Sequence, residues 1–375
     1  MIASAQILRP TWAEIDLSAL GRNLVKLRGL AGPRCRVLFV VKANAYGHGV
    51  QAVARYAQSR GLCEMFGVSS VEEGLALRGW GIALPILVLG SIYPFEAFRH
   101  ALAHNLSVTV SSLDAARQIE RAAEETGHVA RCHVKVDTGM GRIGARRPGA
   151  VKILNFLRGC AHVEVEGVYT HFSCADTDAA YTRTQLRHFT DTLTECSRNG
   201  IAAGIRHCAN SAAALNFPES RLDMIRPGFA AYGLADGFEP VLSLKTGIVY
   251  IKDLRGGASV SYGRSYRCRG LARVATVPAG YGDGYTRALS NRAEIVVRGR
   301  RCRVIGNITM DMLMADVSAV PDAAVGDEAV LIGRQGGEAI TAAELAGLAG
   351  TIPYEITTAI SARVPRVFIN ETDAD

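Results

Sequence analysis

Short apolar runs alternate with amphipathic stretches from residue 36 to about residue 230. The apolar runs are rich in β-branched residues and are bounded by turn-forming residues, so they are predicted to be strands. They cover residues 36–42, 65–70, 85–90, 106–110, 131–136, 163–170, 205–208 and 222–226. The stretches between them, such as residues 71–80 and 112–126, have the period of helices. Strand and helix therefore alternate regularly along this part of the chain.

This alternation predicts a parallel sheet with helices packed against it. Eight successive strand–helix units favour a closed (β/α)8 barrel of the TIM type, and an open doubly wound sheet is the alternative. No Gly-x-Gly-x-x-Gly turn follows the first predicted strand. Its absence disfavours the open sheet, which often carries that turn.

The pattern changes after Pro240 to strands separated by glycine-containing turns. This predicts a mostly β domain, whose strands cover residues 243–254, 258–267, 272–278, 294–298, 302–317 and 329–333. A helix over residues 342–349 should follow Thr341, which is a suitable N-cap. We therefore expect residues 1–240 to form the α/β barrel domain and residues 241–375 to form the C-terminal β domain. Residues 1–17 are expected to pair with the C-terminal domain.

Composition narrows the class of protein. The 375 residues, with 49% hydrophobic and 21% charged, are typical of a soluble enzyme with a sizeable core. Nine cysteines without a Cys-x-x-Cys pair suggest neither a disulfide framework nor a zinc site, so no metal is expected. The start of the chain lacks a secretory pattern and no apolar stretch is long enough to span a bilayer, so we expect a cytoplasmic protein. The net charge of +7 comes from dispersed arginines, which argues against nucleic-acid binding.

One lysine closes a buried-looking strand in a chain that otherwise uses arginine. Lysine accounts for six of the 42 basic residues, and Lys42 directly follows the apolar run of residues 37–41. An amine in an apolar pocket loses its proton and becomes a nucleophile that can form a Schiff base, whereas a guanidinium cannot. Covalent catalysis through Lys42 is the leading hypothesis. The alternative is a lysine that caps the strand with its amine in water.

Further polar residues follow other predicted strands. The loops after barrel strands surround one open face, so these side chains should meet there. They are Arg142 after the fifth strand, His171 at the sixth, Asn210 and Ser211 after the seventh, and Arg226 and Gly228 at the eighth. The last two loops usually form a phosphate pocket. A reactive lysine facing a phosphate pocket predicts pyridoxal 5'-phosphate as cofactor. Each residue alone also has a structural explanation, as a core histidine, a surface arginine or a helix cap.

The segment Val41-Lys42-Ala43-Asn44-Ala45-Tyr46-Gly47-His48-Gly49 resembles the cofactor-lysine motif of alanine racemases. The resemblance continues along the chain in the family's order, through residues 135–144, 170–172, 209–211, 225–228, 260–263, 280–284, 310–311 and 353–355. It implies a pyridoxal-phosphate enzyme that interconverts L- and D-alanine, built from a barrel and a β domain.

The resemblance also implies roles for individual residues. Lys42 would carry the cofactor and act as the base on one face of the substrate, and Tyr262 would act on the other. Arg142 and the backbone amide of Met310 would bind the substrate carboxylate, and Tyr281 would narrow the entrance. Arg142 would also contact the cofactor. The remaining cofactor-binding residues would be Tyr46, His171, Asn210, Ser211, Arg226, Gly228, Phe229 and Tyr354. Lys135 would be a carbamylated lysine that braces Arg142, or would form a plain salt bridge.

In the family the residues of the second domain reach the site from the partner subunit. The resemblance therefore implies a head-to-tail homodimer with composite sites. A broader serine racemase and a decarboxylase of the same fold are the alternatives, and a non-catalytic cofactor carrier would lack the β domain. The decarboxylase should have a carboxylate at the position of Arg226. Supply of D-alanine for peptidoglycan and breakdown of alanine are both compatible with the sequence.

Overall fold

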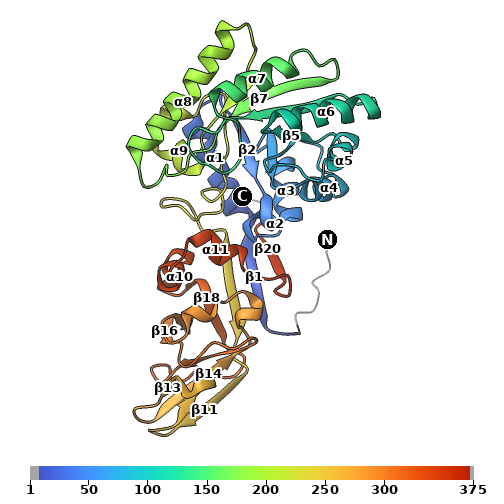
Figure 1. Cartoon of the computed structure of the whole chain (residues 1–375). Coiled ribbons are helices and arrows are strands. Elements are labelled where there is room, and N and C mark those ends of the chain that lie inside the picture. Colours follow the sequence, from blue (N-terminus) through green and yellow to red (C-terminus); the bar gives the residue numbers. More distant parts are fainter. Residues whose placement is uncertain (1–7, 372–375) are drawn as a thin grey trace. The chain divides into compact units, whose positions relative to one another are not determined.

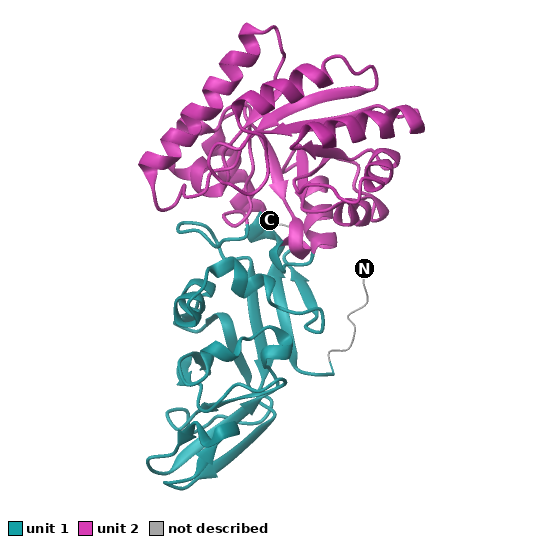
Figure 2. Cartoon of the chain, in the orientation of Figure 1, with its two compact units in different colours: residues 1–20, 46–49, 232–375 teal, residues 21–45, 50–231 magenta. Residues whose placement is uncertain are grey.

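The computed structural model describes residues 8–371. The chain divides into two compact units (Figure 2), one made of residues 21–45 and 50–231 and the other of residues 1–20, 46–49 and 232–375. Residues 1–7 and 372–375, which were assigned to the two expected domains, lie outside the described part.

The first unit is a barrel of parallel strands (Figure 1). Its strands are β2 (Arg36–Val40), β3 (Met65–Val68), β4 (Ile86–Val88), β5 (Ser107–Val110), β6 (Ala130–Lys135), β7 (Val163–Tyr169), β8 (Ile205–His207) and β9 (Met224–Ile225). They pair in the order β8-β7-β6-β5-β4-β3-β2-β9, all parallel. The backbone N–H of Arg226 donates to the Ala209 carbonyl at 2.9 Å, which links the ends of this order. The predicted closed barrel is thus confirmed, and the open sheet is excluded.

Helices lie outside the strands, as Figure 1 shows. They are α3 (Val50–Ser59), α4 (Val71–Gly79), α5 (Ala97–Ala103), α6 (Leu113–Thr126), α7 (Arg147–Leu157), α8 (Ala179–Arg198) and α9 (Ser211–Asn216), and α1 (Leu17–Ala31) precedes β2. Helix α6 illustrates the local causes: the Ser112 hydroxyl accepts from the Ala115 N–H, and Gly127 ends the helix at φ 66°. Its buried face includes Ile119, so the amphipathic pattern sets which side packs on the strands.

The second unit is mostly β. Its larger sheet has the order β16-β15-β18-β10-β1-β20, with β19 beside β18. The strands are β1 (Thr11–Asp16), β10 (Leu242–Gly247), β15 (Glu294–Val297), β16 (Arg300–Arg303), β18 (Glu328–Gln335), β19 (Glu338–Ile340) and β20 (Arg366–Ile369). The amino-terminal strand β1 pairs antiparallel with β10 and parallel with β20. Helices α10 (Ala342–Ala349) and α11 (Pro353–Thr358) precede the last strand.

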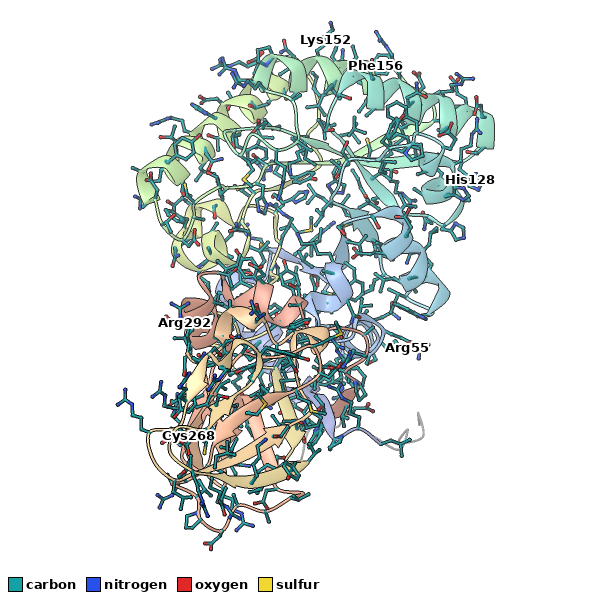
Figure 3. The ribbon with its side chains drawn as sticks, turned by 60° about the horizontal axis from the view of Figure 1, so that its bottom comes forward. Arg55, His128, Lys152, Phe156, Cys268 and Arg292 are labelled. Atoms are coloured by element: carbon teal, nitrogen blue, oxygen red, sulfur yellow. The ribbon has the colours of Figure 1, made fainter. Side chains whose placement is uncertain are left out.

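A smaller sheet completes this unit, with the order β11-β14-β17 and a separate hairpin of β12 and β13. The strands are β11 (Tyr250–Leu254), β12 (Ser259–Val260), β13 (Tyr266–Arg267), β14 (Ala272–Val277) and β17 (Leu313–Asp316). Cys268, labelled in Figure 3, packs in its hydrophobic cluster with Val260, Val274 and Ile305. The cluster gives this sheet a core of its own.

Four predicted strands differ most from the structure. Residues 258–267 form two short strands, β12 and β13, which pair as a hairpin around the loop of Tyr262. Residues 243–254 form two strands in different sheets, β10 and β11, because β10 pairs with β1 and β18 whereas β11 pairs with β14. Residues 302–317 are interrupted where Gly306 adopts φ +79°, so that β16 and β17 also belong to different sheets. The first barrel strand ends at Val40, before Lys42.

Candidate active site

Lys42 begins a left-handed turn that joins β2 to the next segment. Ala43, Asn44 and Ala45 have φ of 51°, 54° and 54°, a conformation that L-residues other than glycine rarely adopt. The Ala45 N–H donates to the Val41 carbonyl at 2.9 Å, and the Val50 N–H donates to Asn44 Oδ1 at 2.9 Å. These contacts hold the strained segment next to Lys42.

A carboxylate from α4 supports the same turn. Glu73 Oε1 accepts the Ala43 N–H at 2.7 Å. Its other oxygen, Oε2, accepts the backbone N–H and the hydroxyl of Ser69 at 2.7 and 2.8 Å. Glu73 thus ties the turn after Lys42 to the end of β3.

The Lys42 amine lies in a cationic environment. Removal from water lowers its pKa, the Arg142 charge lowers it further, and Glu73 opposes both effects. The neutral form of this amine is therefore more populated than in a lysine exposed to water. Arg142 itself lies in the exposed loop after β6.

Lys135 ends β6 on the same face and is almost fully buried. Burial lowers its pKa to about 7, and the charges of Arg226 and Arg142 contribute. Its Nζ lies 4.9 Å from the centroid of the Tyr169 ring. A substantial fraction of this amine is therefore neutral near neutral pH.

Arg226 follows β9 and is buried inside the barrel. Its Nη2 donates to the Thr170 carbonyl at 2.7 Å and lies 3.3 Å from His171 Nδ1. Its Nη1 lies 3.1 Å from His207 Nδ1. Burial, followed by the Arg226 charge, lowers the pKa of both His171 and His207 well below the ordinary histidine value. Both rings are therefore neutral acceptors for the guanidinium.

The loops after β8 and β9 meet at Ser211. The buried Ser211 hydroxyl accepts the Gly228 N–H at 2.9 Å and the Ala230 N–H at 3.4 Å. Asn210 caps α9 through the Ala213 N–H at 3.0 Å. Phe229 lies between the two amides that reach Ser211. Because the Ser211 oxygen accepts in both of these hydrogen bonds, its O–H can still donate to another acceptor, as a phosphate site would require.

The donor set of the barrel unit fits pyridoxal 5'-phosphate. Four cations of this unit lie close enough to affect one another. In addition to burial, the charge of Arg142 lowers the pKa of Lys42, and the charges of Arg226, Arg142 and Lys42 lower the pKa of Lys135. Such a cluster suits an anionic ligand, because phosphate and carboxylate groups offset the repulsion between the cations. The amine of Lys42 adds a group able to bond to an aldehyde.

The other unit holds two of the predicted cofactor residues. The rings of Tyr46 and Tyr354 meet edge to face with centroids 6.4 Å apart. Burial, followed by Tyr354, raises the pKa of Tyr46 to about 12, so its hydroxyl stays protonated. Gly47 follows at φ +85°, and a Cβ there would collide with the Thr357 carbonyl. The glycine thus allows this segment to lie close to α11.

Tyr262, Tyr281 and Met310 also belong to this unit. Tyr262 is 75% exposed and Met310 is 53% exposed. The Tyr262 loop is strained, because Ser261 before it has φ 65° and ψ −179°, a region used almost only by glycine. Asn307 Nδ2 donates to the Tyr262 carbonyl at 2.8 Å and holds the loop. The Gly282 N–H donates to the Met310 carbonyl at 2.9 Å, which brings the loops of Tyr281 and Met310 together.

The predicted site residues therefore fall into two sets. The barrel unit contains Lys42, Lys135, Arg142, His171, Asn210, Ser211, Arg226, Gly228 and Phe229, and the β-rich unit contains Tyr46, Tyr262, Tyr281, Met310 and Tyr354. The sequence interpretation missed Tyr169 and His207, which contact Lys135 and Arg226. It also missed Glu73, which accepts the backbone N–H next to Lys42. Polar side chains on the inward face of apolar strands were the available signal for Tyr169 and His207.

Two further properties concern residues 8–371. No group of three or more His, Cys, Asp and Glu side chains within this range is arranged to hold a metal ion. None of its helices is both long and apolar enough to cross a membrane.

Comparison with known proteins gives consistent matches. The family described as "Alanine racemase, N-terminal domain" matches residues 15–236, and "Alanine racemase, C-terminal domain" matches residues 241–368. The alanine racemase of Symbiobacterium thermophilum is 46% identical over 374 residues, covering 97% of this chain and 98% of that protein. That of Halothermothrix orenii is 41% identical over 375 residues, covering 98% of each chain.

Solved structures agree. The alanine racemase of Clostridium difficile 630 has a TM-score of 0.91 at 36% identity and covers 97% of both chains. The alanine racemase of Bacillus anthracis with bound L-Ala-P has a TM-score of 0.90 at 35% identity, covering 97% of this chain and 96% of that one. Similarity thus extends over nearly the whole chain in both sequence and fold.

Proposed function

Because the chain belongs to the alanine racemase family, we propose that it interconverts L-alanine and D-alanine with pyridoxal 5'-phosphate as cofactor. One observation of the structure carries the proposal. It is the Lys42 amine, with its pKa lowered by burial and by Arg142, at the carboxyl end of a barrel strand. The bound cofactor supplies an electron-withdrawing ring system that makes the α-proton of an attached amino acid acidic.

The residues of this chain would hold the cofactor at several points. Lys42 would attach to its aldehyde, and Arg226 would face its ring nitrogen. Because a guanidinium carries only donors and keeps its proton, Arg226 would leave that nitrogen largely unprotonated. Arg142 would contact the ring oxygen. The phosphate and its surroundings would be bound by Tyr46, His171, Asn210, Ser211, Gly228, Phe229 and Tyr354.

Racemisation requires a proton to leave one face of the α-carbon and another to arrive on the opposite face. Lys42 would serve one face and the Tyr262 hydroxyl the other. Arg142 and the Met310 backbone N–H would bind the carboxylate of alanine, and Tyr281 would narrow the entrance. Both bases would be positioned by strained backbone, at Ala43 to Ala45 and at Ser261.

A homodimer would complete the site. Tyr262 and Met310 are exposed on the β-rich unit, and their roles require a covering partner surface. We therefore infer that these residues act in the site of a second copy of the chain, giving two composite sites. Dilution that dissociates the dimer should abolish activity, and fully active monomers would refute this assembly.

Among residues 8–371 no carboxylate lies within ion-pair distance of Arg226, and its neighbours are His171, His207 and backbone carbonyls. The decarboxylase alternative requires a carboxylate in place of Arg226, and this chain has the arginine there, so racemisation is the better supported reaction. We further propose a cytoplasmic location.

Spectroscopy and chemical trapping test the function. The purified protein should show the visible band of bound cofactor, and borohydride reduction with peptide mapping should place a pyridoxyl group on Lys42. Circular dichroism should decay to zero on adding L-alanine, and a parallel run with L-serine tests the breadth of substrates. A pyridoxyl group on another residue, or a constant signal with both amino acids, would overturn the proposal.

The two-base arrangement has its own test. Tyr262→Phe should block proton exchange that starts from L-alanine while the cofactor remains attached to Lys42. Tyr266→Phe, a few residues away on β13, is the matched control. Equal exchange in the two variants would remove Tyr262 from the catalytic pair.

A further inference from the structure

A chain of hydrogen-bonded side chains runs from Arg226 through the barrel interior. Arg226 Nη1 lies 3.1 Å from His207 Nδ1, and His207 Nε2 lies 2.9 Å from His133 Nδ1. His133 Nε2 then lies 3.3 Å from Glu166 Oε2. The Ser107 hydroxyl donates to the same carboxylate oxygen at 2.6 Å. Four strands, β5 to β8, and the residue after β9 thus contribute to one continuous chain.

The chemistry of its first member sets the direction of the whole chain. A guanidinium only donates hydrogen bonds, so His207 Nδ1 must accept and the proton of the neutral His207 ring must be on Nε2. His207 then donates to His133 Nδ1, which leaves the His133 proton on Nε2. His133 finally donates to Glu166, a carboxylate that only accepts. Every donor therefore meets an acceptor in one orientation of the chain.

The barrel is built around these rings. His133 and His207 are fully buried, whereas the Glu166 side chain retains 20% exposure. A Cβ on Gly167, beside Glu166 on β7, would lie 2.5 Å from His133 Nδ1. The absence of a side chain at residue 167 therefore makes room for the His133 ring. Hydrogen bonds from His133 and Ser107 outweigh burial and hold the pKa of Glu166 below its ordinary value, so this carboxylate is charged at neutral pH.

Arg226 needs such a counter-charge. A fully buried guanidinium is unfavourable unless its charge is compensated, and no carboxylate among residues 8–371 contacts it directly. We propose that Glu166, acting through His133 and His207, is a positioning residue that stabilises the charge of Arg226 and fixes its orientation. The proposal rests on the proposed function, in which Arg226 faces the cofactor's ring nitrogen.

The charge of Glu166 affects which reaction of the bound amino acid is favoured. Removing the negative charge of Glu166 makes the Arg226 cation less stable, and hence a stronger proton donor toward the ring nitrogen. A more protonated ring is a stronger electron sink, which favours transamination as a side reaction. Glu166 therefore keeps Arg226 a weak acid and favours racemisation over transamination.

Glu166→Gln tests the charge while retaining the shape. The donors of Arg226 fix the direction of every hydrogen bond in this series of side chains. The new amide at residue 166 must therefore turn its oxygen toward His133, so that the His133 and His207 rings keep their orientation. Glu164→Gln is the matched control, since Glu164 lies on the same strand with 56% exposure and pairs with Arg131 on the surface. The readouts are the formation of pyridoxamine phosphate per turnover, kcat and KM for L-alanine, and 15N NMR of labelled histidines. His133→Asn and His207→Asn assign the NMR signals.

We expect Glu166→Gln to raise pyridoxamine phosphate per turnover by roughly tenfold and to lower kcat with little change in KM, an effect typical of residues that orient a reactive group. Glu164→Gln should leave both unchanged. In the unmodified protein both imidazoles should carry their proton on Nε2. Equal side-reaction ratios in the two variants, or a proton on Nδ1 of either ring, would overturn the proposal. A protein that binds no cofactor would refute the proposed function instead. The imidazole signals of that protein would still show whether the hydrogen bonds from Arg226 to Glu166 have the proposed direction.

Discussion

Glu73→Gln should loosen the turn that carries Lys42. Left-handed backbone costs about 1–2 kcal/mol per residue for L-amino acids, so Ala43, Asn44 and Ala45 together require about 3–6 kcal/mol of compensating contacts. Glu73 supplies one of these contacts through the Ala43 N–H and binds Ser69 with its other oxygen. A glutamine has a single acceptor oxygen, so its amide must face one of these donors.

The expected loss of stability and activity follows from the hydrogen bond that the glutamine cannot make. A hydrogen bond to a charged acceptor contributes about 1.5–3 kcal/mol, and the partial exposure of this site reduces the value to about 1–2 kcal/mol. The free energy of unfolding should fall by that amount. Because about 1.4 kcal/mol corresponds to a factor of ten, kcat/KM should fall roughly fivefold to thirtyfold as the lysine loses its orientation.

A glycine provides the rescue. Ala43 is exposed, so Ala43→Gly removes little packing and relieves roughly 1 kcal/mol of backbone strain. The double variant should therefore recover part of both losses. Glu72→Gln is the control, because Glu72 precedes Glu73 in the first turn of α4 and carries the same charge.

The assay is a double-mutant cycle measured by denaturant unfolding and by racemisation kinetics. Two outcomes would refute the reasoning. One is a Glu73→Gln protein indistinguishable from Glu72→Gln. The other is an Ala43→Gly substitution that worsens the Glu73→Gln protein, because strain would then not be the quantity that Glu73 offsets.

Three other expectations follow from the structure. Burial and Arg226 depress the pKa of both His207 and His171, so the unfolded chain takes up protons first as pH falls below the ordinary histidine pKa. From about pH 6.5 downward, each of the two rings should lower the free energy of unfolding by up to about 1.4 kcal/mol per pH unit. His128→Asn, at an exposed site labelled in Figure 3, should leave this slope intact, and a flat profile would contradict the expectation. Carbon-13 NMR with labelled bicarbonate should show a carbamate signal that disappears in Lys135→Arg but persists in Lys152→Arg, whereas persistence in both would exclude carbamylation of Lys135. Gly47→Ala should destabilise the protein by at least about 1 kcal/mol, because residue 47 has a φ of +85° and the new Cβ would collide with the Thr357 carbonyl. An unchanged thermal midpoint would disprove that collision.

The barrel could be predicted from sequence because each of its strands is a short local apolar run. The run before Lys42 and the Thr341 cap of α10 depend only on neighbours in the chain, and both were identified. The splits within residues 243–254 and 302–317 could not, since they arise where the chain leaves one sheet for another, and sheet membership depends on distant partners.

The site shows the same limit. Residues such as Lys42 and Arg226 stand out as polar groups at strand ends, and their roles remain predictions. The role of Glu73 could not be predicted from sequence, because its contact with Ala43 depends on a left-handed turn that no local propensity favours. The link between His133 and His207 depends on the register of neighbouring strands and on the missing side chain of Gly167.

The chain passes between its two units after residues 20, 45, 49 and 231. The β-rich unit takes its strand β1 from the beginning of the chain and β20 from the end, and it also includes the four residues that follow the turn after Lys42. Neither unit is a contiguous cassette, so recombination at a single crossover near residue 231 would join a barrel to a β unit that lacks matching strands. Engineered chimaeras therefore need their junctions at all of these crossings.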